Sequence, residues 1–279
     1  MSRAYYNEID PFAAQWLRNL IEAGHIAPGD VDERSIEDVT AKDLTGYTQC
    51  HFFAGIGVWS YALRRAGWPD NRPVWTGSCP CQPFSGAARG EGFADKRHLW
   101  PTWFSLISQC SPVEIFGEQV ASKDGLDWLD LVQVDLQTAD YAFAVADLCA
   151  AGVGAPHIRQ RIWFVAEWLA DTSRDGLQGG IYRGAGQKWQ MEHGSAGCLR
   201  PTGGLVGAEP GGPTNGVWRD VDWLLCKDGK WRPVEPGTFP LVNGTPSRMG
   251  RLCAYGNAIN AELATLFIAS YMDIKRGGA

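Results

Sequence analysis

The stretch Ser78–Ser85 (SCPCQPFS) places a cysteine between two prolines, just after the short β-like run Pro73–Gly77. Pro80 and Pro83 fix the backbone on either side of Cys81. Open α/β sheets bind ligands at the carboxyl ends of their strands, and a thiol on a loop there is placed to act as a nucleophile. A buried structural cysteine is the alternative for any single cysteine. We therefore predict an α/β fold with Cys81 as the nucleophile.

The segment Pro80–Ser85 resembles the catalytic motif of the DNA (cytosine-5) methyltransferases. This resemblance implies a Rossmann-like sheet, S-adenosylmethionine as cofactor with S-adenosylhomocysteine as product, and double-stranded DNA as partner. It makes the glycine-punctuated residues 86–92 part of a catalytic loop, although an ordinary surface loop explains the glycines equally well. The contacts implied around this loop are Ser85, Arg89 and Arg97 with DNA, and Pro80 and Leu99 with the cofactor.

A second segment, Phe53–Gly57 (FAGIG), follows the strand-like residues 49–52 and precedes a predicted helix, Trp59–Ala66. Glycines in such a turn let the backbone approach a bound nucleoside closely, but a single Gly-x-Gly is weak support. The complete segment resembles the first S-adenosylmethionine motif of the same family. The resemblance implies cofactor contacts from Phe53, Gly55, Ile56 and Gly57.

Near the amino terminus, Tyr5–Pro11 predicts a strand end that runs into a turn and then a helix, Phe12–Ala23. An acidic residue at the end of a strand can accept both hydroxyls of a ribose, and a surface carboxylate is the alternative for Glu8. Asn7–Pro11 resembles the second cofactor motif of the family, in which Glu8 holds the ribose and Ile9 covers the adenine. A chance match is the other interpretation of this segment.

The third cofactor position of the family is an Asp-Ile pair that meets the adenine. Its best match here is Ser35-Ile36, within Val31–Val39, which we expect to be a short strand. Asp32 and Asp38 are the alternatives for the missing carboxylate.

The order of these segments differs from the usual one, in which the glycine strand comes first. We predict a sheet permuted at its amino terminus, in which adjacent parallel strands carry the glycine turn and Cys81. Because β-helix-β crossovers are right-handed as a rule, this order either moves helix Trp59–Ala66 to the opposite face or requires a left-handed connection. The sequence leaves both arrangements open.

An acid follows the next predicted strand, Val113–Phe116, at Glu118. It resembles the acid of the family's Glu-Asn-Val motif, with Gln119 in place of the asparagine, a change that affects only the supporting hydrogen bond. The resemblance implies that Glu118 meets the N3 and amino edge of cytosine. A group placed there stabilises the charge that a thiolate pushes onto the ring when it adds to carbon 6.

Two arginines, Arg159 and Arg161, precede the predicted strand Ile162–Ala166. Two residues apart on extended backbone, they point the same way and suit a carbonyl and a phosphate. A salt-bridged sheet edge is the alternative. The family has a glutamine where this chain has His157, and the resemblance adds both arginines to the catalytic residues Cys81 and Glu118.

The composition changes after residue 166. Residues 172–216 are rich in glycine, arginine and glutamine, as long loops are, and Val221–Cys226 with Lys230–Val234 predicts a hairpin. This insert suits a base-reading module or a solvated lid. The resemblance makes residues 167–249 a target recognition domain and residues 1–166 with 250–279 a discontinuous catalytic domain, whose last motif includes Asn257 and Ala258 before a final helix.

Composition limits the other possibilities. A chain of 279 residues holds one large domain or a domain with a smaller partner. The net charge of −6 weakly opposes a nucleic-acid partner, but residues 1–50 are especially acidic, which leaves room for a basic groove elsewhere. The eight cysteines lack zinc-ligand spacing, so we expect free thiols and no metal. No apolar run approaches the roughly 20 residues of a membrane span, and we expect a cytoplasmic monomer without membrane contact.

Taken together, the segments predict a DNA (cytosine-5) methyltransferase, of the kind found in restriction–modification systems, that flips its target base and forms a covalent bond from Cys81 to carbon 6. Two other classes stay open. One is an RNA methyltransferase of the same fold that acts on cytosine in tRNA. The other is a non-catalytic DNA-binding relative.

Overall fold

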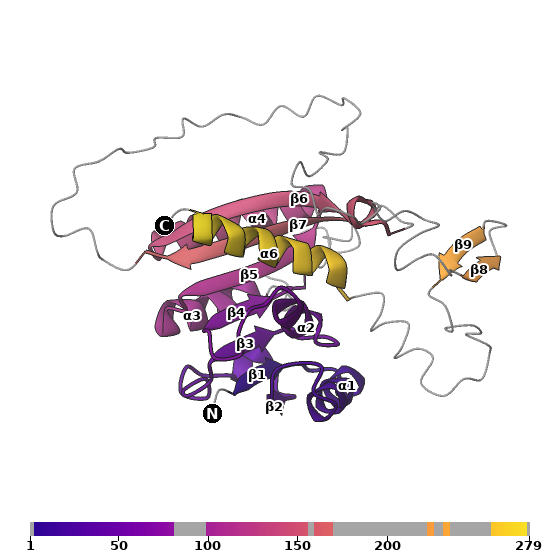
Figure 1. The fold of residues 1–279 in the computed structure, drawn as a ribbon. Helices are drawn as coiled ribbons and strands as arrows, with labels where there is room; N and C mark the ends of the chain where they lie inside the picture. Colours follow the sequence, from indigo (N-terminus) through magenta and orange to yellow (C-terminus); the bar gives the residue numbers. More distant parts are fainter. Residues whose placement is uncertain are drawn as a thin grey trace, which may run out of the picture.

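The computed structural model describes residues 3–80, 99–155, 159–169, 222–225, 231–234 and 258–277. Helices and strands alternate along most of this length, as expected for an α/β fold (Figure 1). In chain order the elements are β1 (Ala4–Asn7), α1 (Pro11–Glu22), β2 (Gly29–Asp32), η1 (Ile36–Asp38), β3 (Gln49–Phe52), α2 (Val58–Arg65), β4 (Val74–Gly77), α3 (Trp100–Cys110), β5 (Glu114–Val120), α4 (Lys123–Thr138), β6 (Tyr141–Cys149), η3 (Ala150–Val153), β7 (Gln160–Trp168), β8 (Asp222–Leu225), β9 (Trp231–Val234) and α6 (Ala261–Gly277).

Seven strands form one sheet in the order β2-β1-β3-β4-β5-β7-β6. Neighbours from β2 to β5 are parallel, whereas β7 is antiparallel to both β5 and β6. This mostly parallel sheet is Rossmann-like, as predicted. The strand that leads into the glycine turn, β3, lies between β1 and β4, so β4, which leads to the segment of Cys81, is its parallel neighbour. The predicted hairpin is present as the antiparallel pair β8-β9.

Two predicted elements differ from the structure. The expected strand Val31–Val39 is wrong beyond Asp32, because Ser35 caps the short 3-10 helix η1 by accepting a hydrogen bond from the backbone N–H of Glu37. The strand expected to stop at Phe116 continues as β5, because β7 pairs with it along its whole length. The acid predicted to follow this strand therefore lies within it.

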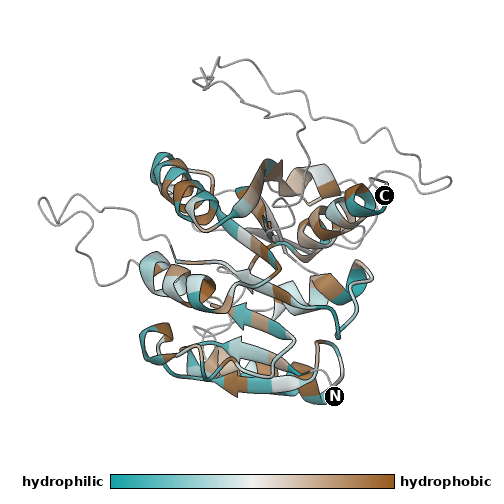
Figure 2. Ribbon diagram, turned by 90° about the vertical axis from the view of Figure 1, so that its left-hand side faces the viewer, coloured by the Kyte–Doolittle hydropathy of each residue, from teal (hydrophilic) through white to brown (hydrophobic). Residues whose placement is uncertain are grey.

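Helices cover both faces of the sheet, because neighbouring residues of each strand point to opposite sides. On one face Phe52 and Trp75 pack against Trp103 of α3 and Trp128 of α4 in one cluster. On the other face α2 and α6 share a second cluster around Phe116, and α1 covers β1 in a third. Each helix carries both brown and teal residues in Figure 2, as expected for helices with one buried side. Burial of each large apolar side chain contributes about 1.5–3 kcal/mol.

The crossover from β3 through α2 to β4 has an unusual hand. Helices α1 and α2 pack on the same face, but the chain moves from β1 toward one sheet edge and from β3 toward the other. The crossovers through α3 and α4 also move toward the β6 edge, but these helices pack on the opposite face. Their crossovers therefore have the same hand as the α1 crossover. Because right-handed crossovers are the rule, the connection through α2 is left-handed. This resolves the two arrangements that the sequence left open.

Local sequence explains where α1 begins. The Asp10 carboxylate accepts a hydrogen bond from the backbone N–H of Ala13 at 2.8 Å, and Pro11 occupies the first turn, where its missing N–H costs nothing. The start of α1 therefore follows β1 after a short turn that contains Glu8. Among the helices in the described ranges, none is long and apolar enough to cross a membrane.

Candidate active site

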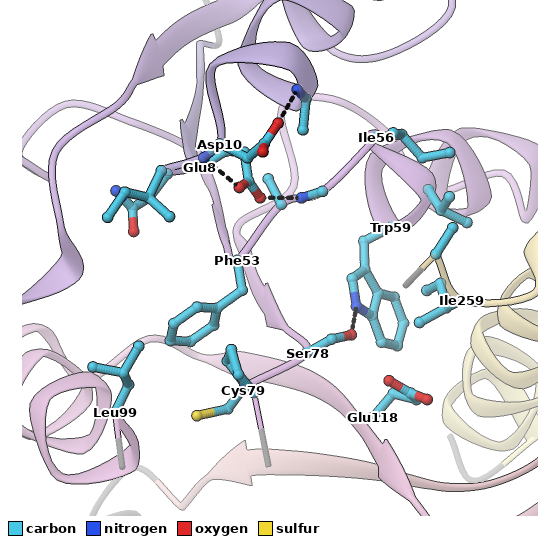
Figure 3. Close-up of a pocket in the computed structure, with 18 of the residues that line it drawn as sticks. Glu8, Asp10, Phe53, Ile56, Trp59, Ser78, Cys79, Leu99, Glu118 and Ile259 are labelled. Atoms are coloured by element: carbon cyan, nitrogen blue, oxygen red, sulfur yellow. Dashed lines mark hydrogen bonds between the residues drawn. The ribbon is translucent and has the colours of Figure 1, made fainter. Parts of the chain in front are cut away.

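A cavity of about 460 Å³ opens at the carboxyl ends of β1, β3 and β4 and beside the end of β5 (Figure 3). Ligands bind at this edge in open α/β sheets. The predicted site residues that line it are Glu8, Ile9, Ser35, Ile36, Phe53, Gly55, Ile56, Pro80, Leu99, Glu118, Arg159, Arg161 and Ala258. Gly57 lies in the same turn but is not part of the cavity wall.

Several predicted residues fall outside the described ranges: Cys81, Ser85, Arg89, Arg97, His157 and Asn257. Their roles stay predictions. The described neighbours of two of these residues nevertheless line the cavity. Pro80, which precedes Cys81, and Ala258, which follows Asn257, both line the cavity.

The first half of the cavity is organised around Glu8, at the end of β1. Its Oε2 accepts a hydrogen bond from the Gly55 backbone N–H at 2.7 Å, and its Oε1 accepts one from the Asp10 N–H at 2.9 Å. Burial raises the pKa of this carboxyl above its ordinary value, and the backbone donors partly oppose that rise. The surface-carboxylate alternative is wrong, because Glu8 is half-buried and lines the cavity.

The glycine turn after β3 requires left-handed backbone. Phe53 has φ 51°, Gly55 has φ 53° and Gly57 has φ 80°. A Cβ on Gly57 would stand 3.0 Å from Leu17 Cδ2 and 3.3 Å from Ile26 Cδ1, so α2 begins in close contact with the region of α1. This packing directs the Gly55 N–H toward Glu8.

Ser35 and Ile36, the residues predicted to meet the adenine, line the cavity, whereas the alternatives Asp32 and Asp38 are not part of its wall. Asp32 accepts a hydrogen bond from the Tyr5 hydroxyl at 2.7 Å and pairs with Arg34. These partners lower the pKa of Asp32 to about 2, against an opposing contribution from desolvation. The carboxylate is therefore engaged within the fold.

The second half of the cavity centres on Glu118, whose side chain is 8% exposed. Arg161 Nε lies 2.8 Å from its Oε1. Burial raises the pKa of Glu118, while Arg161, Arg159 and hydrogen bonding from Ser78 all lower it, so burial prevails. The result is a carboxyl group at the cavity wall with an increased affinity for a proton.

Both predicted arginines line the cavity, but not on extended backbone as expected. Arg159 has φ 26° and precedes β7, whereas Arg161 lies within that strand. Arg159 donates from Nη2 to the Ala258 carbonyl at 2.6 Å, which ties the segment before α6 to the site. Burial and the neighbouring Arg161 lower the pKa of Arg159. Of the alternative, a salt-bridged sheet edge, the ion pair is present between Arg161 and Glu118, but β7 lies inside the sheet and not at its edge.

Gln119 supplies a supporting contact despite replacing the expected asparagine. Its Nε2 donates to the Cys79 carbonyl at 3.1 Å, and its Oε1 accepts from the Val120 backbone N–H at 2.8 Å. The side chain is buried and its partner lies two residues before Cys81. Gln119 thus anchors the segment that leads to the predicted nucleophile.

The wall also contains residues that no motif indicated, among them Trp59 and Ser78. The indole N–H of Trp59 donates to Ser78 Oγ at 3.1 Å (Figure 3). A helical aromatic and a serine after a strand carry no motif of their own. The pair becomes visible only when α2 and β4 are placed side by side.

Part of this chain is similar to known proteins. Residues 69–168 match the family model described as C-5 cytosine-specific DNA methylase. The Type II methyltransferase M.HhaI of Haemophilus parahaemolyticus is 26% identical over 168 residues, which cover 46% of this chain and 51% of that protein. The chain thus spans about half the length of this curated relative.

Solved structures show weaker similarity. The crystal structure of DNMT2 of Spodoptera frugiperda matches with a TM-score of 0.42 and 19% identity, over 60% of this chain and 43% of that one. A putative DNA modification methyltransferase encoded within prophage Cp of E. coli matches with a TM-score of 0.36 and 16% identity, over 60% of this chain and 47% of that one.

Proposed function

We propose that this chain, which belongs to the DNA cytosine-5 methyltransferase family, transfers a methyl group from S-adenosylmethionine to carbon 5 of cytosine in DNA. One observation carries the proposal beyond family membership. A single cavity joins a carboxylate beside a glycine turn, Glu8, to a second carboxylate that pairs with an arginine, Glu118. The first half suits a nucleoside cofactor and the second suits a heterocyclic base.

The residues of the first half fit S-adenosylmethionine. A Cβ on Gly55 would meet no atom within 4 Å, so the turn faces open space that a ligand can enter. Each Glu8 oxygen accepts one backbone N–H and keeps a lone pair for a ribose hydroxyl. Ile9, which is 66% exposed, and Ile36 offer apolar surface for the adenine ring. When bound, the cofactor supplies an electrophilic methyl group.

The second half suits the activation of cytosine. We propose that the Cys81 thiolate adds to carbon 6, and that Glu118 meets the N3 edge and gives it a proton as negative charge develops there. The raised pKa of Glu118 favours this role, because more of the group is protonated near neutral pH. Arg161 holds the ring carbonyl. After methylation a base or water takes the proton from carbon 5, the thiolate leaves, and the proton on N3 returns to Glu118.

The substrate is a cytosine flipped out of duplex DNA, because carbon 6 lies within the stack of a paired base. Residues 167–249 act as the target recognition domain, and residues 1–166 with 250–279 form the catalytic domain with its permuted order of strands. The catalytic sheet extends slightly past the first boundary, because β7 runs to Trp168.

Covalent trapping tests the proposal. Duplex DNA containing 5-fluorocytosine cannot lose its C5 substituent, so the enzyme with S-adenosylmethionine is expected to form an adduct that survives denaturing gel electrophoresis. Cys81→Ser should form none. Cys110→Ser, which removes a free thiol on α3 away from the cavity, is the matched control and should trap normally. A wild-type protein that binds this DNA without an adduct would instead be a non-catalytic relative.

The class of nucleic acid needs a separate measurement. We expect transfer of a tritiated methyl group to duplex DNA and not to tRNA, and bisulfite sequencing of DNA from expressing cells should show methylated cytosines within one sequence motif. Incorporation into tRNA alone would assign the RNA methyltransferase alternative. Methylation scattered without a motif would contradict a site-specific modification enzyme.

A further inference from the structure

Ser78 stands next to Glu118 at the end of the sheet. In the parallel pairing of β4 with β5, Gly77 lies opposite Gly117, so the next residue of each chain is a cross-strand neighbour of the other. Both side chains line the cavity on the face that α2 covers (Figure 3). Adjacent strands lie about 4.8 Å apart. Ser78 is therefore placed to act on Glu118.

The orientation of the Ser78 hydroxyl is set by Trp59. Trp59 is 4% exposed, stacks on Phe116 with ring centroids 6.2 Å apart, and meets Trp163 edge to face at 5.4 Å. Its indole N–H points at Ser78 Oγ at 3.1 Å. By contrast, the buried indole nitrogens of Trp103, Trp128 and Trp163 have no hydrogen-bond partner among the described residues. A rigid donor is thus directed at this one hydroxyl.

The direction of the serine proton follows from elementary chemistry. An indole N–H can only donate, so Ser78 Oγ must accept from it, and the hydroxyl hydrogen is free to point elsewhere. An ionised carboxylate can only accept, and hydrogen bonding from Ser78 favours the ionised form of Glu118. The other charged groups that face Glu118 in the described chain are Arg161 and Arg159, both from the region of β7.

We propose that Ser78, oriented by Trp59, is a positioning residue that holds the Glu118 carboxylate at the cavity wall for the edge of the substrate ring. The proposal rests on the proposed function for the identity of that ring. Glu118 is then held from two neighbouring strands. Arg161 on β7 binds one carboxylate oxygen, and Ser78, at the end of β4, donates to the carboxylate from the other strand. Trp59 matters through the serine and does not itself meet the carboxylate.

Nuclear magnetic resonance titration tests this without any turnover. The protein is labelled with ¹³C at the glutamate carboxyl carbons, and the Glu118 signal is assigned by its loss in Glu118→Gln. Ser78→Ala removes one donor to the carboxylate, so the pKa of Glu118 should rise by about one unit. Ser78→Thr keeps the hydroxyl and should titrate within about 0.3 units of the wild type, on the same scale.

The tryptophan has its own matched control. Trp59→Phe removes the N–H and should raise the pKa of Glu118 by less than Ser78→Ala does, because the hydroxyl remains but loses its orientation. Trp163→Phe removes an indole from the same cluster whose N–H has no partner in the described structure, and should leave the titration unchanged. Equal shifts of the Glu118 pKa in Trp59→Phe and Trp163→Phe would show that the packing of the aromatic cluster, and not the indole N–H, affects the carboxyl group. This result would overturn the proposal, and so would an unchanged titration in Ser78→Ala.

Kinetics then separates this proposal from the proposed function. If protonated Glu118 is the acid, activity falls as pH rises through its pKa, so a raised pKa in Ser78→Ala moves this fall to higher pH. Because the carboxyl group also loses a donor that positions it, we expect kcat on the plateau below this fall to decrease about 10-fold, while KM for S-adenosylmethionine stays within about twofold. If the wild-type protein transferred no methyl group, this would contradict the proposed function. The titration of the Glu118 carboxyl group would still decide the role of Ser78.

Discussion

Glu8 and Glu118 occupy two ends of one cavity, and burial raises the pKa of both, but their partners differ in kind. Glu8 is held by backbone N–H groups of Asp10 and Gly55. Glu118 is held by side chains, with the guanidinium of Arg161 at 2.8 Å and the Ser78 hydroxyl beside it.

The difference matches two tasks. Backbone donors are fixed by the fold and carry no ionisable proton, so they suit a carboxylate that must stay ionised and hold a neutral ribose. Side-chain donors can adjust as a carboxyl group gains and loses a proton. Cofactor affinity should therefore respond to substitutions that shift the backbone near Glu8, whereas kcat should respond to substitutions of the side chains around Glu118.

The largest effect is expected for Glu118→Gln. Glutamine keeps the shape and can pair with Arg161, but it cannot give a proton to N3. We expect kcat to fall about 10²–10⁴-fold, the usual contribution of general acid catalysis. The dissociation constant of S-adenosylmethionine, measured by calorimetry, should stay within about threefold of the wild type. Weakened cofactor binding with unchanged kcat would reverse the assignment of the two halves.

Glu8→Gln should show the opposite pattern. The amide replaces one carboxylate oxygen with a donor that faces a backbone N–H, so the dissociation constant of S-adenosylmethionine should rise about 10–100-fold. At saturating cofactor, kcat should stay within about threefold. A large loss of kcat under saturation would contradict the division between the halves.

The pH dependence of cofactor binding follows from the same contrast. In the proposed function, ionised Glu8 accepts the ribose hydroxyls, and burial raises the pKa of this carboxyl group. Affinity should therefore be lost as pH falls through this raised pKa, beginning at a higher pH than an ordinary glutamate would give. Glu8→Gln should remove this acid limb. The turnover that depends on protonated Glu118 changes in the other direction and falls as pH rises.

Much of this arrangement could be predicted from sequence because its signals are local. The glycine turn and most helices and strands of the described ranges follow from spacing and turn residues within a few positions. The hand of the α2 crossover could not be predicted, because it depends on the face of the sheet on which α2 packs and on the order of the strands. Nor could the hydrogen bond to Asp32 from Tyr5, 27 residues away in the chain, although the ion pair of Asp32 with Arg34 is local.

The site shows the same limit. Arg159 and Arg161 were predicted from their spacing, but Arg159 reaches the cavity from backbone with φ 26° and contacts Ala258, 99 residues away. The pair of Trp59 and Ser78 joins two elements and appears in no local pattern. Motifs therefore indicated residues that line the cavity, whereas the contacts that orient them required the fold.

The smallest expected effect concerns the backbone of the cofactor half. Gly57→Ala adds a Cβ at φ 80° and 3.0 Å from Leu17 Cδ2, so both strain and crowding oppose it. We expect the free energy of unfolding, measured with urea, to fall by about 1–3 kcal/mol. The shifted turn should also move the Gly55 N–H away from Glu8, and cofactor affinity should fall several-fold while the titration of Glu118 is unchanged.

Gly67→Ala, at the other end of α2, separates strain from crowding. Gly67 has φ 82°, yet a Cβ there would meet nothing within 4 Å, and it does not line the cavity. This variant should lose less stability than Gly57→Ala and keep its cofactor affinity. If both variants weakened cofactor binding equally, the start of α2 would not be what holds the glycine turn. The contrast between a backbone-held and a side-chain-held carboxylate would then lose its structural basis, because the loss of affinity would not be specific to the turn that carries the Gly55 donor.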